Sequence, residues 1–155
     1  MNIVLIKDFV NLTRYEEINV RFIELMPIGD LKYWSLSKYI SNERVLERVP
    51  ELIETKSLDI SSPARYYRLP NAKGRVGLIN PISCKFCENC NRIRLTADGK
   101  IKPCLHSNDE IDLKKTLREG GDISTIIENI VKNKPKEHGL EDGNYINRDM
   151  TAIGG

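Results

Sequence analysis

The chain has no long apolar stretch, no leader and no strong excess of either charge. No run of eighteen or more apolar residues occurs among its 155 residues, which argues against a membrane-spanning helix. The first residues carry neither a basic leader nor a cleavage site, and neither repeats nor low-complexity segments occur. The net charge of +2 is too small to indicate a nucleic-acid-binding protein. We therefore expect a cytoplasmic protein without membrane or nucleic-acid partners.

The remaining composition is that of an ordinary soluble domain. Hydrophobic residues make up 40% and charged residues 30% of a chain long enough to bury a core. Cysteine is scarce but concentrated, since Cys84, Cys87, Cys90 and Cys104 are the four cysteines of the chain. In a reducing compartment, clustered cysteines bind metal more often than they pair as disulfides. The sequence therefore predicts a metal site.

The identity of that metal is left open by the cysteine spacing. Four thiolates suit tetrahedral zinc and equally suit an iron–sulfur cluster. A zinc ribbon usually supplies two Cys-x2-Cys pairs, whereas here Cys104 stands alone. If three cysteines bind a [4Fe-4S] cluster, one iron keeps a vacant position that a substrate heteroatom can occupy. Spacing does not decide which sulfur is spare, although Cys87, Cys90 and Cys104 suffice and Cys84 is the outlier.

Two arginines follow the third cysteine. Arg92 and Arg94 are two apart on a strand expected over residues 92–96, so their side chains leave one face while Ile93 points the other way. Such guanidinium groups can clamp a phosphate or carboxylate. The alternative is a pair of solvated arginines on an exposed strand. The expected metal site nearby keeps the anion-binding interpretation open.

The first third of the chain predicts an α/β arrangement. We expect strands over residues 3–6 and 18–26 with a helix over residues 8–13 between them, a βαβ pattern. Only about ten residues link the strands, at the bottom of the range for a crossover, so we expect part of the connection to be absent. A further helix is expected after Asn42 and ends at Pro50.

The rest of the chain predicts antiparallel strands followed by helices. Four strands are expected, over residues 64–69, 75–79, 92–96 and 100–102. The last two flank the turn residues Ala97-Asp98-Gly99, and this hairpin should bring Cys90 back towards Cys104. Two helices are expected, over residues 111–117 and from a capping box at Thr125 and Glu128 up to Pro135. His106, two positions after Cys104, could serve as a zinc ligand, but we expect it to be a polar surface residue and His138 to be solvated.

Three segments carry a resemblance to a known family. Residues 87–100 read CENCNRIRLTADGK and residues 103–105 read PCL. Together they resemble the second cluster motif of the molybdenum cofactor biosynthesis protein A family, the GTP 3',8-cyclases among the radical S-adenosylmethionine (SAM) enzymes. Residues 20–29, VRFIELMPIG, are similar to the strand and loop that line the cofactor site in that family. The chain also ends in the Gly-Gly tail of the family.

The resemblance implies a fold and a division of the chain. The fold class is α/β: the C-terminal part of an incomplete radical SAM (β/α) barrel, then an antiparallel β cluster-binding region and C-terminal helices. The partial barrel would occupy residues 1–62. The region that binds the [4Fe-4S] cluster and GTP would occupy residues 63–155.

The resemblance also implies roles for individual residues. Cys87, Cys90 and Cys104 would ligate a [4Fe-4S] cluster whose open iron binds the purine of GTP, and Cys84 would be a bystander. Arg92, Ile93 and Arg94 would contact GTP, Met26 would contact SAM, and Gly154 and Gly155 would reach into the active site. The reaction would convert GTP to (8S)-3',8-cyclo-7,8-dihydroguanosine 5'-triphosphate in molybdenum cofactor biosynthesis. Cyclic pyranopterin monophosphate synthase would act downstream.

One departure from the family pattern is as informative as the match. The family begins with a Cys-x3-Cys-x2-Cys motif, and no such motif occurs here. We therefore expect a C-terminal half whose missing partner is the N-terminal radical SAM half or a second copy of the chain, and which is inactive alone. A rival interpretation is a small structural zinc module that uses all four cysteines and binds protein or nucleic acid.

Overall fold

The computed structural model describes residues 5–29, 38–57, 59–140, 145–146 and 148–154. The chain divides into two compact units. The first unit combines Met1–Met26 with Ser37–Cys90, and the second combines Pro27–Leu36 with Asn91–Gly155. Gly155, to which the sequence assigns a role, lies outside the described residues.

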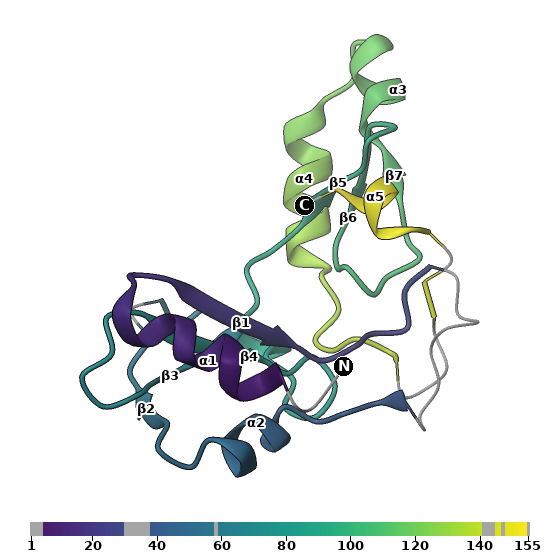
Figure 1. Ribbon diagram of the computed structural model, residues 1–155. Helices are drawn as coiled ribbons and strands as arrows, with labels where there is room; N and C mark the ends of the chain where they lie inside the picture. The colour runs from purple at the N-terminus through teal and green to yellow at the C-terminus, as the bar shows by residue number, and fades with distance from the viewer. Residues whose placement is uncertain (1–4, 30–37, 58, 141–144, 147, 155) are drawn as a thin grey trace. The chain divides into compact units, whose positions relative to one another are not determined.

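The first unit is built on a mixed four-stranded sheet (Figure 1). Its strands are β1 (Asn19–Ile23), β2 (Ile53–Thr55), β3 (Ala64–Arg68) and β4 (Arg75–Ile79), in the spatial order β1-β4-β3-β2. β1 runs parallel to β4, whereas β3 is antiparallel to both of its neighbours. The expected strands over residues 64–69 and 75–79 are confirmed. The barrel interpretation stays a prediction, because these residues form a mixed sheet.

Two helices cover one face of this sheet. α1 (Ile6–Tyr15) and α2 (Glu43–Arg48) bury one apolar side each against it. The core cluster joins helix and strand side chains: Ile6, Val10, Phe22, Val45, Val49, Tyr67, Leu69, Ala72, Val76 and Leu78. Along β1 the buried Phe22 lies between the exposed Arg21 and Ile23, so the other face of the strand is open.

The strand expected over residues 3–6 is wrong where the structure describes it. Ile3 and Val4 lie outside the described residues, but Ile6 begins α1. The buried residues of that helix are Ile6, Val10 and Thr13, a spacing of four and three that belongs to a helix and not to a strand. The parallel partner of β1 is therefore β4, much later in the chain.

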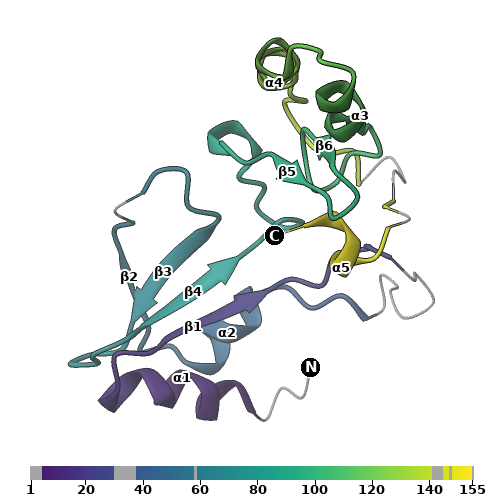
Figure 2. The same ribbon diagram turned by 90° about the horizontal axis from the view of Figure 1, so that it is seen from above.

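The second unit contains a three-stranded antiparallel sheet and short helices (Figure 2). The strands β5 (Arg94–Leu95), β6 (Lys100–Lys102) and β7 (Ile111–Asp112) lie in that order. The expected hairpin is confirmed, and its turn contains Gly99 with a φ of 87°. The helices are α3 (Leu113–Arg118), α4 (Ile123–Lys132) and α5 (Met150–Ile153).

Three sequence predictions for this unit need correction. β5 is shorter than the expected strand over residues 92–96, so Arg92 precedes it and does not share its face with Arg94. The helix expected over residues 111–117 begins only at Leu113, after β7. α4 is capped by Asp122 and not by Thr125, because the Asp122 carboxylate accepts from the N–H groups of Ser124 and Thr125 at 2.9 and 3.2 Å.

The boundary between the two compact units differs from the boundary of the expected functional division at residues 62 and 63. β3 and β4 belong to the sheet of β1, so the first unit extends to Cys90. The assignment of residues 1–62 and 63–155 to separate functions stays a prediction. In the part of the chain that the structure describes, no helix is both long and apolar enough to cross a membrane.

Candidate functional site

Two of the predicted metal ligands lie on one tight turn. Cys87 begins the single-turn 3-10 helix η4 (Cys87–Asn89), and the Cys90 N–H donates to the Cys87 carbonyl at 3.1 Å. We call residues 84–90 the cysteine knuckle. Cys87 and Cys90 are half-buried, whereas Cys84 is exposed. The bystander role of Cys84 stays a prediction.

A buried asparagine ties the loop before the knuckle to the sheet. Asn42 is the N-cap residue of α2, as the sequence predicts, but its side chain makes no capping hydrogen bond. Its amide instead donates to the carbonyls of Phe22 and Ile79 at 3.1 and 3.0 Å, and to the Asn80 side chain at 2.7 Å. Asn42 therefore joins the ends of β1 and β4 and holds the residue after β4.

Glu24 is a buried carboxylate that the sequence analysis does not identify. It follows β1 and lies two residues before the half-buried Met26, the predicted SAM contact. Burial by itself would raise its pKa, but hydrogen bonds from Ser83, Tyr39 and Ile82 outweigh burial and leave the pKa below its ordinary value. One sequence signal does indicate that Glu24 faces the core. It continues the alternating positions of Val20 and Phe22, which lie on one face of the strand.

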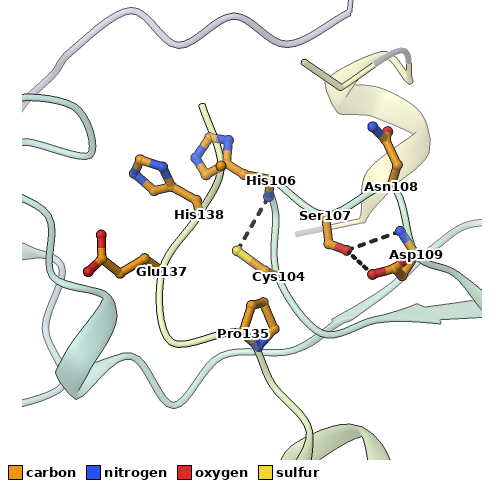
Figure 3. A pocket seen from close by; sticks show the side chains of 9 residues that line it. Cys104, His106, Ser107, Asn108, Asp109, Pro135, Glu137 and His138 are labelled. Atoms are coloured by element: carbon orange, nitrogen blue, oxygen red, sulfur yellow. Dashed lines mark hydrogen bonds between the residues drawn. The ribbon is translucent and has the colours of Figure 1, made fainter. Parts of the chain in front are cut away.

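The third predicted ligand, Cys104, lines a pocket of about 400 Å³ in the second unit (Figure 3). Its Sγ accepts the backbone N–H of His106 at 3.4 Å. Such N–H donors to sulfur are one of the contacts by which proteins tune thiolate-bound clusters. The other lining residues are His106, Ser107, Asn108, Asp109, Pro135, Glu137, His138 and Gly139.

His106 and His138 are buried in this pocket, and the expectation that they are solvated is wrong. Their rings meet edge to face, with centroids 4.9 Å apart (Figure 3). Burial, together with electrostatic interactions with His138, Arg94 and Lys102, lowers the pKa of His106 to about 4. The imidazole beside Cys104 is therefore neutral near pH 7.

The structure brings Arg94 together with the C-terminal tail. The Arg94 guanidinium donates to the carbonyl oxygen of Gly154. Gly154 has a φ of 80°, and a Cβ atom placed on it would lie 2.0 Å from the carbonyl oxygen of Leu95. Only glycine fits this close approach to β5. Arg92 is exposed, and its carbonyl accepts from the Lys134 ammonium at 2.9 Å.

A second arginine anchors the same tail. Arg148 makes two hydrogen bonds to the Asp98 carboxylate, at 3.1 and 2.8 Å, and its Nε lies 2.7 Å from Glu110. The Arg148 guanidinium lowers the pKa of Asp98 well below its ordinary range. The sequence does not predict this role, because residues 98 and 148 are fifty positions apart.

The predicted ligands are shared between the two units. Cys87 and Cys90 belong to the first unit and Cys104 to the second, so a common site for the three sulfurs stays a prediction. Among the described residues, no group of three or more His, Cys, Asp or Glu side chains is arranged to hold a metal ion. The donor set itself suits a soft metal centre, since it consists of thiols on a tight turn and a thiol with an N–H donor.

Comparison with known proteins finds one matching family model. The model described as Molybdenum Cofactor Synthesis C matches residues 18–140, which is most of the chain. The match includes the cysteine knuckle, Arg92, Arg94 and Cys104.

Curated proteins of known name also match over nearly the whole chain. A GTP 3',8-cyclase of Peptoclostridium acidaminophilum is 64% identical over 97% of this chain and 46% of its own length. A GTP 3',8-cyclase of Alkaliphilus metalliredigens is 52% identical over 97% of this chain and 48% of its own length. A GTP 3',8-cyclase of Clostridium botulinum strain Okra is 43% identical over 97% of this chain and 47% of its own length. The chain thus spans about half the length of these relatives, in their C-terminal part.

Proposed function

Because the chain belongs to the Molybdenum Cofactor Synthesis C family, we propose that it is the substrate-binding C-terminal part of a GTP 3',8-cyclase. In this proposal the complete enzyme is a radical SAM lyase that converts GTP to (8S)-3',8-cyclo-7,8-dihydroguanosine 5'-triphosphate. Its product would pass to cyclic pyranopterin monophosphate synthase. The chain supplies binding and orientation for GTP.

The contact between Arg94 and Gly154 is the observation that carries this proposal. The two residues are sixty positions apart, and the family resemblance implies that Arg94 contacts GTP and that Gly154 reaches into the active site. Their contact supports a single location for Arg94 and Gly154. A glycine at this position lets the backbone approach a substrate closely. Such close contacts help to hold two reacting groups in the correct orientation.

The proposed cluster site consists of Cys87, Cys90 and Cys104. These three thiolates would hold a [4Fe-4S] cluster, which would supply a binding position for a heteroatom of guanine. Arg92 and Arg94 neutralise the phosphate charge by charge-assisted hydrogen bonds, and Ile93 packs beside the nucleotide. Met26 contacts SAM in the complete enzyme. Gly154 and Gly155 reach into the active site and approach the reacting atoms.

The missing partner is proposed to be the N-terminal half, or a second copy of this chain. The relatives are about twice as long, and the chain matches their C-terminal part. Within the described residues, β1 is an outer strand of the sheet, and an outer strand presents unpaired backbone groups. Large apolar side chains are also exposed nearby, on β1 and α1: Ile23, Phe9, Leu12 and Tyr15. A partner that continues the sheet would cover both features.

GTP is expected to bind the anaerobically reconstituted chain more tightly than UTP, which has the same triphosphate charge. Replacing Arg94 by Gln should weaken GTP binding by about 10- to 100-fold, the usual cost of a charge-assisted hydrogen bond. The exposed Arg118 of α3 provides the control, and R118Q should leave the affinity unchanged. Isothermal titration measures the affinities. Equal binding of GTP and UTP would refute recognition of the base.

The reconstituted chain alone is expected to form no 5'-deoxyadenosine from SAM. The Cys-x3-Cys-x2-Cys motif of the family is absent, so the chain lacks the thiolates that hold the SAM-cleaving cluster. Incubation with GTP, SAM and dithionite, followed by chromatography, checks this. Detection of 5'-deoxyadenosine above a protein-free control contradicts the prediction.

A further inference from the structure

Glu24 is among the most completely buried side chains of the first unit, with 2% of its surface exposed. It accepts four hydrogen bonds. One carboxylate oxygen accepts the backbone N–H groups of Ile82 and Ser83 at 3.1 and 3.0 Å. The other accepts the hydroxyls of Ser83 and Tyr39 at 2.5 and 2.9 Å. All four donors are electrically neutral groups.

A buried carboxylate at this position is costly unless it has a specific use. Removing a charge from water costs several kcal/mol, on the order of what well-formed hydrogen bonds return. The side chain continues the core-facing positions of Val20 and Phe22, where an apolar residue would pack without that cost. The structural use of Glu24 must therefore lie in the groups that it holds.

Three of the four donors lie in the loop that leads to the cysteine knuckle, and the fourth is the Tyr39 hydroxyl. Ile82 and Ser83 follow the end of β4 at Ile79 and come directly before Cys84. Two residues, Lys85 and Phe86, separate Cys84 from the half-buried Cys87. Because Oε2 accepts from two consecutive N–H groups, it fixes the path of the backbone there as well as its position.

Asn42 supports the same loop from its other end. Its amide holds the Asn80 side chain at 2.7 Å, while the N–H of Glu24 donates to the Ile79 carbonyl at 3.1 Å. Two buried polar side chains therefore anchor three positions of this loop, residues 80, 82 and 83, to the ends of β1 and α2. The knuckle begins on a backbone that the sheet has already fixed.

We propose that Glu24 is a positioning residue that fixes the cysteine knuckle, and so presents Cys87 and Cys90 to the metal centre. This inference rests on the proposed function for the metal, but the fixing of the loop is independent of it. Glu24 does not touch the metal. It acts through the backbone of Ile82 and Ser83, and it ties the knuckle to the strand that leads to Met26.

The test compares two substitutions of Glu24 in the full chain. The amide oxygen of E24Q can accept both backbone N–H groups, and its NH2 can donate to the Tyr39 and Ser83 hydroxyls, which also accept. E24A removes every one of these contacts. E54A is the matched control, because Glu54 is an exposed carboxylate of the same unit, bound to Arg65 at 2.9 Å.

Hydrogen exchange of the metal-free chain gives the first measurement. Backbone amides of residues 82–90 are expected to exchange at least about tenfold faster in E24A than in wild type, the effect of losing more than one hydrogen bond. E24Q and E54A should match wild type within about twofold. Amides of β4 should keep their protection in every variant. Equal exchange of residues 82–90 in E24A and wild type overturns the proposal.

Iron release from the reconstituted chain to a chelator gives the second measurement. E24A should release iron faster than wild type, while E24Q retains it. If wild type takes up no iron but the exchange result holds, the metal centre is refuted and the positioning role stands. If E24A does not fold, Glu24→Leu decides, because it fills a similar volume without offering an acceptor to the N–H groups of Ile82 and Ser83. Residues 82–90 must then exchange faster than in wild type, and unchanged exchange there overturns the proposal.

Discussion

Replacing Cys90 by Ala is expected to remove nearly all iron from the anaerobically reconstituted chain, whereas Cys84→Ala leaves the iron content unchanged. Changes in groups that only support metal ligands already cost roughly 10- to 100-fold in affinity, and loss of one ligand costs at least as much. Cys87→Ala and Cys104→Ala should have the same effect as Cys90→Ala. Cys84 is exposed and, in the proposed three-cysteine site, is not a ligand. Iron and zinc analysis with a visible spectrum measures the outcome.

The same four variants separate the cluster from the rival zinc module. A tetrahedral zinc site needs all four sulfurs, so Cys84→Ala would then lose metal as completely as Cys90→Ala. A colourless zinc protein with that pattern contradicts the three-cysteine cluster. The variants should fold alike, because the loop before the knuckle is held by Asn42 and Glu24 and not by the cysteines.

Local chemistry made the hairpin next to the cysteines predictable from the sequence. The turn after Ala97 needs a left-handed residue, which Gly99 supplies with a φ of 87°. This turn sets the pairing of the two flanking strands, in which Arg94 lies opposite Lys102. α2 and the strands β3 and β4 were predictable for the same reason, since their boundary signals lie within a few residues.

Features that depend on distant partners were not predictable in this way. A short apolar run such as residues 3–6 fits a strand or a helix, and only the burial of Ile6 with Val10 identifies the helix. The sequence predicts a surface position for His106, because its contact with His138 arises only in the folded chain. The sequence alone shows Glu24 only as a polar residue near the end of a strand. Its hydrogen-bond donors come from the loop after β4, which is distant in the sequence.

The Gly-Gly tail is a different case, because sequence resemblance names the residue while only the structure gives the physical reason. Gly154 lies in the left-handed region and touches the Leu95 carbonyl, so two separate constraints select glycine there. Arg94 and Arg148 then hold the tail on the second unit, through Gly154 and Asp98 respectively. The tail is thus docked by residues of the chain itself.

Gly154→Ala is expected to release the tail from β5. The backbone of Gly154, with a φ of 80° and a ψ of 156°, costs a non-glycine residue about 1–3 kcal/mol, and here the added Cβ would also lie 2.0 Å from the Leu95 carbonyl oxygen. That distance cannot be tolerated, so the tail must move and Arg94 loses its contact with the Gly154 carbonyl. We expect local opening of residues 148–154 to increase by more than about tenfold, since 1.4 kcal/mol corresponds to a factor of ten.

Gly120→Ala separates the two causes. Gly120 has a φ of 72°, close to that of Gly154, but a Cβ atom there meets nothing within 4 Å. It therefore carries the left-handed cost without the steric clash, and its effect should stay local to the end of α3. Hydrogen exchange of residues 148–154 should be raised by Gly154→Ala and unaffected by Gly120→Ala. If both variants leave the tail protected, close packing against Leu95 is not what requires glycine at position 154.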